Sequence, residues 1–260
     1  MAFRGDGKIA IITGASSGIG RASALLFAEA GFQLVLGARR KQKLEAVADE
    51  ILHRTGNKPL VLNLDVTVPD SCEQFVQVAV DTFEKVNVLL NNAGLGRGTE
   101  HIEDVKDETD WQTMIDTNIM GLLRMTRLTI PHLVASGDGH IINLGSIAGR
   151  VAYAGGSVYC ATKFAVRAIT DTLRQELLGK PVRITTIDPG MVETEFSIVR
   201  YRGNVEKANA VYADMQPLTA EDIADCILFA ATRPSHVNID AMIVKPRDQA
   251  GAGKVARHIN

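Results

Sequence analysis

The sequence is poor in cysteine, has almost no net charge and contains no long apolar run. Its 260 residues include three cysteines, odd in number and widely spaced, which predicts neither a disulfide framework nor a metal site. A formal net charge of -2 gives no reason to expect nucleic acid or an anionic membrane surface as a partner. Because no apolar run approaches roughly 18 residues, we expect no membrane-spanning helix.

The N-terminal residues 1–8 also lack the features of a secretory signal. They contain neither an apolar core nor a small-residue cleavage site. We therefore expect an intracellular, cytoplasmic protein. With no visible linker, internal repeat or low-complexity segment, residues 1–260 fit a single domain that can bury a sizeable core.

Apolar, β-rich runs alternate with amphipathic segments along the chain. Such alternation is typical of βαβ units, in which right-handed crossovers join parallel strands. We predict a Rossmann-like, doubly wound α/β fold with a mainly parallel seven-stranded sheet and helices on both faces. The strands are expected at 9–13, 33–38, 59–64, 87–90, 141–144, 182–187 and 239–244.

A glycine-rich turn, T-G-A-S-S-G-I-G at 13–20, follows the first expected strand. Its spacing matches neither the G-x-G-x-x-G fingerprint nor the P-loop. However, Gly14, Gly18 and Gly20 let the backbone approach a ligand, and the N–H groups that open the next helix can hold a pyrophosphate. The context of strand, turn and helix predicts a nucleotide site, with a plain glycine-rich turn as the alternative.

The second expected strand ends at Ala38 and is followed by Arg39 and Arg40. In NAD-binding proteins of this type a carboxylate usually stands here and binds the ribose hydroxyls. Guanidinium groups suit a 2′-phosphate instead. The sequence therefore favours NADP over NAD, and arginines of a solvated helix start are the alternative.

The segment at 143–163 holds a serine, a tyrosine and a lysine in a spacing that suits proton transfer. Tyr159 and Lys163 are four residues apart on an expected helix, so they share one face. A free tyrosine has a pKa of about 10, and a neighbouring cation favours its charged form. Ser146 follows a strand, at the edge where open α/β sheets bind ligands. A solvated tyrosine beside a solvated lysine is the alternative.

In their order and spacing these motifs resemble the short-chain dehydrogenase/reductase family over nearly the whole chain. The matching stretches include N-N-A-G at 91–94 and P-G at 189–190. The resemblance implies that Tyr159 is the general acid/base and that Ser146 binds the substrate oxygen. It implies that Lys163 lowers the tyrosine pKa and binds the nicotinamide ribose, while Asn118 holds a water between Lys163 and solvent.

The motifs and the resemblance together predict the residues that bind NADP(H). Those at the carboxyl edge of the sheet include Asp65, a candidate partner of the adenine amino group, and Thr194, which the resemblance places near the carboxamide or phosphates. The predicted set is Gly14, Ser16, Ser17, Gly18, Ile19, Gly20, Arg39, Arg40, Asp65, Val66, Asn92, Ala93, Gly94, Tyr159, Lys163, Pro189, Gly190, Val192 and Thr194.

Within the family, the segments 114–118, 146–150, 189–196 and 236–246 resemble the branch that oxidises serine and related 3-hydroxy acids with NADP. The resemblance also implies a homotetramer. A bound carboxylate needs a cationic or hydrogen-bonding neighbour. The tentative partners are Arg150, Arg200 and Arg202, with surface arginines on loops as the alternative.

Two further segments have no regular pattern. Residues 195–217 are expected to form a lid over the site, and the tail at 249–260 is either mobile or crosses to a neighbouring subunit. We expect an NADP-dependent oxidoreductase that acts on a small alcohol or carbonyl compound, chiefly a 3-hydroxy acid or 3-hydroxy amino acid. The alternatives are a reductase of a bulkier aldehyde or ketone and, more remotely, a non-catalytic NADPH-sensing protein.

Overall fold

The computed structural model describes residues 5–258. The expectations about residues 1–4 and about the last two tail residues, 259–260, lie outside the described residues. Within the described range the chain builds a seven-stranded sheet, in the order β3-β2-β1-β4-β5-β6-β7, with every pair parallel. The predicted fold class is confirmed. The strands are β1 (Ile9–Thr13), β2 (Gln33–Ala38), β3 (Leu60–Asn63), β4 (Val88–Asn91), β5 (Gly139–Leu144), β6 (Val182–Pro189) and β7 (Ala241–Val244).

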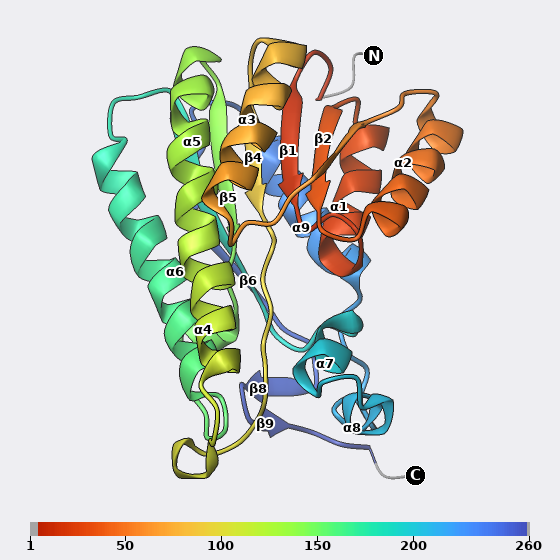
Figure 1. The fold of residues 1–260 in the computed structure, drawn as a ribbon, viewed down its shortest axis with the longest axis vertical. Helices are drawn as coiled ribbons and strands as arrows, with labels where there is room; N and C mark the ends of the chain where they lie inside the picture. The colour runs from red at the N-terminus through yellow and green to blue at the C-terminus, as the bar shows by residue number, and fades with distance from the viewer. Residues whose placement is uncertain (1–4, 259–260) are drawn as a thin grey trace.

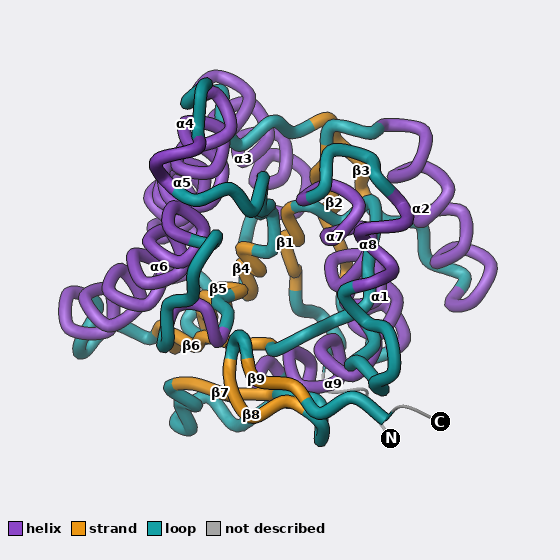
Figure 2. The backbone as a smooth tube through the Cα atoms, turned by 90° about the horizontal axis from the view of Figure 1, so that it is seen from below, coloured by secondary structure: helices purple, strands orange, loops and turns teal. Residues whose placement is uncertain are grey.

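The central strands are buried and largely apolar because helices cover both faces of the sheet. Every residue of β1 is buried, and Ile11 lies opposite Val35 of β2 and Leu89 of β4. Figures 1 and 2 show α1, α2 and α9 on one face and α3, α5 and α6 on the other. The larger helices are α1 (Gly18–Glu29), α2 (Lys41–Thr55), α3 (Pro69–Phe83), α5 (Leu122–Ala135), α6 (Ser157–Glu176) and α9 (Ala220–Ala231).

Local signals fix where several helices begin and end. Pro69 opens α3, where its missing N–H costs nothing. Gly56 ends α2 in the left-handed conformation, with φ 76. Thr219 and Asp222 form a capping box at the start of α9. In the described part of the chain, no helix is both long and apolar enough to cross a bilayer.

The regions expected to be irregular contain short elements. The lid segment, residues 195–217, holds α7 (Glu195–Arg200) and α8 (Val205–Ala210), capped by the side chains of Thr194 and Asn204. The tail forms a hairpin of β8 (Gln249–Gly251) and β9 (Lys254–Val255). Helices this short carry no full apolar period, so periodicity alone missed them. Figure 1 shows all four elements below the carboxyl ends of the strands.

The helical stretch at 109–135 is not one regular helix. It consists of α4 (Thr109–Ile115), the π-helix η2 (Asp116–Gly121) and α5. A π-helical turn widens the backbone spacing, and such turns are frequent at functional sites. Here the turn carries the buried Asn118.

A buried histidine lies near the amino end of β5. His140 Nε2 is 2.8 Å from the Thr185 hydroxyl, and Nδ1 has no hydrogen-bond partner among the described residues. Burial, together with the charges of Arg183 and Lys8, lowers the pKa of His140 well below its ordinary value. The folded protein therefore keeps this imidazole neutral.

We expect this histidine to make the fold sensitive to acid. In the unfolded chain His140 takes up a proton below about pH 6.5, while the folded protein cannot, so its stability falls as the pH drops. Between pH 7 and 5 this one group accounts for up to about 2 kcal/mol. Urea unfolding at both pH values should show that His140→Gln loses less free energy of unfolding between pH 7 and 5 than the parent does. The control is His53→Gln, which changes an exposed residue of α2. If this control reduced the loss as much as His140→Gln does, the result would contradict this account.

Candidate active site

Hydrogen bonds join the turn after β1 to the loop after β4. The Thr13 hydroxyl accepts from the backbone N–H groups of Asn92 and Ala93, at 3.1 and 3.0 Å. In return, Asn92 Nδ2 donates to the carbonyls of Thr13 and Gly14, at 2.8 and 3.2 Å. The strand order reverses between β1 and β4, and open α/β sheets bind ligands at such a point.

A groove of about 340 Å³ opens beside these loops. Gly14, at φ +67, and Gly20 pack so closely on Asn92 that a Cβ at either position would collide with its side-chain amide. Thirteen of the predicted cofactor residues line this groove: Gly14, Ser16, Ser17, Gly18, Ile19, Arg39, Arg40, Asp65, Val66, Asn92, Ala93, Gly94 and Thr194.

The donor set of the groove fits a dinucleotide phosphate. Helix α1 begins at its edge with Gly18, and the N-cap Ser17 makes no side-chain capping bond, so backbone N–H groups remain available to an anion. Arg40 donates to the hydroxyls of Ser17 and Ser16, at 2.6 and 3.2 Å, and thus extends over the glycine-rich turn. Arg39 lies beside it and is exposed.

A larger cavity of about 470 Å³ adjoins the groove, because both are lined by Asn92, Gly94 and Thr194. The cavity brings together Ser146, Tyr159 and Lys163, as predicted from the motif spacing. The remaining predicted cofactor residues Pro189, Gly190 and Val192 also line it, whereas Gly20 lines neither hollow.

Tyr159 lies between an aromatic ring and a guanidinium group. Its ring centroid is 5.5 Å from that of Phe196 and 5.6 Å from Arg200 Cζ. Burial, and secondarily the nearby Tyr153, raise the pKa of Tyr159 well above its ordinary value. The Ser146 side chain and the Arg200 charge act in the opposite direction. The resting phenol is therefore protonated and poised to donate.

Lys163 is buried beside Tyr159. Its Nζ donates to the Leu144 carbonyl at 2.7 Å and lies 6.0 Å from the tyrosine ring centroid. Burial lowers the pKa of Lys163 to about 8, while the charge of Asp188 opposes this shift. In this structure the groups that lower the Tyr159 pKa are Ser146 and Arg200, so the predicted effect of Lys163 stays a prediction.

The other two polar residues of the predicted catalytic set are held by backbone groups. Asn118 Oδ1 accepts from the Leu95 N–H at 2.9 Å, and its Nδ2 donates to the Leu95 carbonyl at 2.8 Å and the Thr162 hydroxyl at 3.1 Å. The Ser146 hydroxyl accepts from Ala148 N–H at 3.1 Å, which caps the short helix η3 (Ile147–Gly149). The water proposed for Asn118 stays a prediction.

Of the three arginines predicted for a substrate carboxylate, Arg200 alone lines the cavity. Arg150 pairs with the buried Asp188 at 2.6 Å and lines neither hollow. Arg202 is exposed and pairs with Glu100 and Asp110, at 2.6 and 2.8 Å. Both are neutralised by acids elsewhere, so the structure places them outside the candidate site.

The sequence reading missed several cavity residues. Tyr153 accepts a 2.7 Å hydrogen bond from Arg200 Nη1 and lines the cavity. Gln249, in the tail of the same chain, accepts from Met191 N–H at 2.8 Å and also lines it. No sequence pattern marks Gln249. Tyr153 lies between Ser146 and Tyr159 in the sequence, and this position is the one signal that could have marked it as a site residue.

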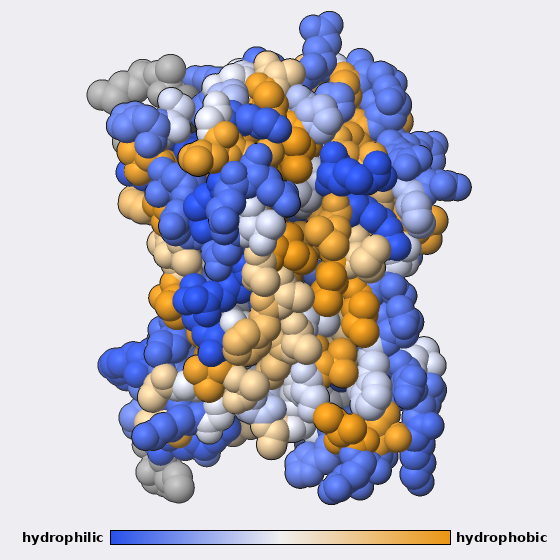
Figure 3. Space-filling view, turned by 90° about the vertical axis from the view of Figure 1, so that its left-hand side faces the viewer, coloured by the Kyte–Doolittle hydropathy of each residue, from blue (hydrophilic) through white to orange (hydrophobic). Residues whose placement is uncertain are grey.

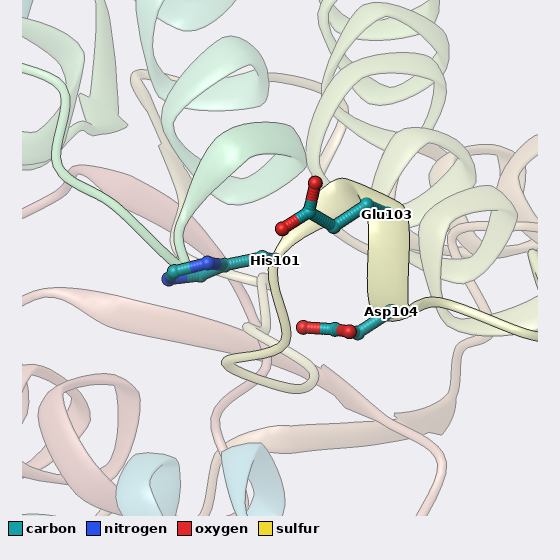
Figure 4. Close-up of side chains that lie close together, drawn as sticks. All are labelled: His101, Glu103 and Asp104. Atoms are coloured by element: carbon teal, nitrogen blue, oxygen red, sulfur yellow. The ribbon is translucent and has the colours of Figure 1, made fainter.

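A group of three exposed residues could in principle hold a metal ion. Figure 4 shows His101, Glu103 and Asp104 at the turn η1 (Ile102–Asp104), and their ligand atoms lie within 4.8 Å of one another. None of the three lines the groove or the cavity. Exposed acidic groups are common without an ion, so we assign no metal site to them.

Comparison with known proteins gives consistent matches. The family model for short chain dehydrogenases matches residues 8–203. The NADP-dependent 3-hydroxy acid dehydrogenase of Schizosaccharomyces pombe is 45% identical over 253 residues, 97% of each chain. Sulfoacetaldehyde reductase 2 of Chromohalobacter salexigens is 44% identical over 243 residues, 93% of this chain and 95% of the other.

A solved structure is similar over the same extent. The closed form of serine dehydrogenase complexed with NADP⁺ is 38% identical, with a TM-score of 0.89. The match covers 96% of this chain and 100% of the other.

Proposed function

Since the chain belongs to the short-chain dehydrogenase family, we propose that it transfers hydride between NADP(H) and a small 3-hydroxy acid or 3-hydroxy amino acid. The chain is an NADP-dependent oxidoreductase that acts on hydroxyl or carbonyl groups. The observation that carries the substrate class is the guanidinium of Arg200, 5.6 Å from the ring of Tyr159 inside the cavity.

The charges around the cavity support an anionic substrate. Arg200 and Lys163 are the cations among its described lining residues, and those residues include no aspartate or glutamate. A substrate carboxylate in the cavity can therefore bind a cation without competition from an acidic side chain. Hydrogen bonds between charged groups are stronger than those between neutral groups. The short separation of Arg200 and Tyr159 suits a molecule whose carboxylate and hydroxyl are few bonds apart.

Two hydrogen bonds hold the side chain of Arg200, the proposed carboxylate partner, in place. Arg200 donates to the Tyr153 hydroxyl at 2.7 Å and to the Gly98 carbonyl at 3.3 Å, and its guanidinium lies 5.4 Å from the Tyr153 ring centroid. A guanidinium held in this way loses little side-chain freedom when a ligand binds. Among residues 5–258 its other N–H groups have no hydrogen-bond partner, and they can make a bidentate contact with a carboxylate.

We propose the following roles around the reacting carbon. Tyr159 takes the hydroxyl proton during oxidation and gives it back during reduction. The Ser146 hydroxyl holds the substrate oxygen, and Lys163 supplies positive charge beside the phenol. The bound nicotinamide exchanges the hydride. The protein's task is then to align the two carbons and to control one proton.

The size of the cavity favours a second candidate, the reduction of a bulkier aldehyde or ketone. About 470 Å³ exceeds what a three-carbon acid fills and falls within the range of drug-sized ligands. Apolar side chains of Leu95, Phe196 and Val211 are part of its lining. A sulfoacetaldehyde reductase among the relatives is consistent with a small anionic aldehyde as an intermediate case.

We propose that the enzyme assembles as a homotetramer. Figure 3 looks onto the side formed by α5 and α6 and shows apolar side chains gathered there. Met120 of η2, Leu123 of α5 and Phe164 of α6 are exposed. Phe229 of α9 and Ile243 of β7 are exposed on a second face. Two separate apolar faces supply the two kinds of contact that a tetramer with dihedral symmetry uses.

We also propose that the enzyme works in the cytoplasm. Cys72, Cys160 and Cys226 are all free thiols in the structure. Free thiols persist in a reducing compartment, whereas oxidising compartments favour disulfides.

The substrate class is tested by following nicotinamide absorbance with L-serine, L-allo-threonine and 3-hydroxypropionate, with NADP and with NAD as control. We expect turnover with NADP. Replacing the proposed carboxylate partner, Arg200→Ala, should lower kcat/KM for carboxylate substrates about 10- to 100-fold relative to a neutral alcohol or aldehyde, since one charged hydrogen bond contributes about 1.5–3 kcal/mol.

The matched control is Arg202→Ala, which removes an exposed arginine outside both hollows. We expect this variant to keep the parent's preference. Failure of all three acids while NADPH still reduces a neutral carbonyl compound would favour the bulkier-substrate alternative. Equal losses on charged and neutral substrates in Arg200→Ala would refute the carboxylate contact.

The proposed acid/base is tested by Tyr159→Phe. Removing the hydroxyl should lower kcat about 10²- to 10⁴-fold, the usual contribution of a general acid or base. NADPH binding, measured by nicotinamide fluorescence, should change little because the ring remains. A large loss of NADPH affinity with turnover retained would rule out the assigned role.

The preference for NADP is tested by Arg40→Ala and Arg39→Ala. Each guanidinium supplies a charged hydrogen bond to the 2′-phosphate, so we expect NADPH to bind roughly 10- to 100-fold more weakly. NADH lacks that phosphate, and its affinity should stay close to that of the parent. Equal weakening of NADPH and NADH in fluorescence titrations would be inconsistent with a 2′-phosphate site here.

A further inference from the structure

A carboxylate on the lid segment lies against the cationic edge of the groove. Glu195, the first residue of α7, accepts from Arg40 Nη1 at 2.6 Å and from Lys43 Nζ at 2.5 Å. Arg40 is the N-cap residue of α2, and Lys43 lies in its first turn. Through these two ion pairs, the lid is joined to the element that follows β2, more than 150 residues earlier in the chain.

The same short helix also enters the cavity. Phe196, its second residue, packs on the Tyr159 ring, and Arg200, its last residue, lies beside both Tyr159 and Tyr153. Helix α7 has six residues, so about 9 Å separates its ends. This one short helix therefore contacts the groove through its first residue, Glu195, and carries the proposed substrate contact, Arg200, as its last residue.

We propose that Glu195 is a positioning residue that couples the 2′-phosphate end of the groove to the seating of Arg200 and Phe196 in the cavity. The inference builds on the proposed function, because it uses the cofactor and substrate contacts assigned there. Glu195 itself touches neither reacting atom. It acts through α7, whose placement depends on the ion pairs with Arg40 and Lys43.

The charges of the cluster give the proposal its direction. Arg39, Arg40 and Lys43 bring three cations to this edge, and Glu195 brings one acid. Hydrogen bonds from Lys43 and Arg40 hold the pKa of Glu195 at about 2, so its carboxylate stays charged at every working pH. A 2′-phosphate adds about two negative charges to the same cations. The Glu195 carboxylate and a bound 2′-phosphate therefore compete for the Arg40 guanidinium, and their negative charges repel each other.

This sharing predicts opposite effects on the two ligands. Without the Glu195 charge, the phosphate has the cations to itself, so NADPH binds equally well or more tightly. The lid, however, loses its two ion pairs, and Arg200 is held less firmly over the substrate. Mere damage to the fold would weaken both ligands together.

The test compares Glu195→Gln with the matched control Glu193→Gln. Glu193 lies two residues earlier and makes no ion pair in the described part of the chain. For Glu195→Gln we expect an NADPH Kd equal to or below that of the parent by nicotinamide fluorescence. At saturating NADP, the substrate KM should rise about fivefold, the upper range for exposed ion pairs. Glu193→Gln should match the parent in both measurements.

A nucleotide-free measurement follows the lid directly. Amide hydrogen exchange at 195–200 should be faster in Glu195→Gln than in the parent or in Glu193→Gln, because the helix has lost its contacts with α2. Lys43→Gln removes one ion pair and leaves Arg40 in place. It should raise the substrate KM as well, and the double variant should add little to Glu195→Gln alone.

Three results would overturn the proposal: weaker NADPH binding in Glu195→Gln, an unchanged substrate KM, or the same change in Glu193→Gln. The assay uses whichever alcohol or carbonyl compound the parent turns over. Failure of every 3-hydroxy acid therefore overturns only the proposed substrate. NADPH fluorescence and hydrogen exchange continue to test Glu195 in that case.

Discussion

The candidate site depends first on the hydrogen bonds between Thr13 and Asn92, which hold the turn after β1 against the loop after β4. A parallel sheet brings these two strand ends side by side, but only polar contacts can keep irregular backbone in register there. The close approach of Gly14 and Gly20 to Asn92 leaves no room for a Cβ at either position. The same contacts that build the groove therefore explain why glycine stands at these positions of the motif.

Desolvation then governs the chemistry of the cavity. Burial shifts the pKa of Tyr159 upward and that of Lys163 downward, because it penalises the charged form of each side chain. Tyr159 can release its proton readily only if a nearby positive charge offsets the cost of burying the phenolate. Arg200 supplies such a charge beside Tyr159, and it is also the proposed carboxylate partner. The guanidinium of Arg200 thus acts on the pKa of Tyr159 and is also the group proposed to bind the substrate.

The fold and the core of the site could be predicted because they are encoded locally. Strand and helix periods give the sheet, and the i, i+4 spacing places Tyr159 beside Lys163. The choice among the arginines could not be made in this way, because Arg150 is neutralised by Asp188 and Arg202 by Glu100 and Asp110. These acids lie 38 to 102 positions away, and only the fold brings them close. The short helices and the tail hairpin escaped prediction for a different reason, because elements of two to six residues carry no full periodic pattern.

Helix α7 shows how such distant contacts become functional. Its sequence, E-F-S-I-V-R, has no apolar period of its own, yet its first residue pairs with α2 and its last with Tyr153. A helix of six residues is not stable by itself in water. Its order must come from tertiary contacts, which include those of Glu195 at the groove, the hydrogen bond between Ser197 and Tyr212, and those of Arg200 in the cavity. Under the role proposed for Glu195, a ligand that alters the contacts at the groove also acts on those in the cavity, and the lid segment would then link cofactor to substrate.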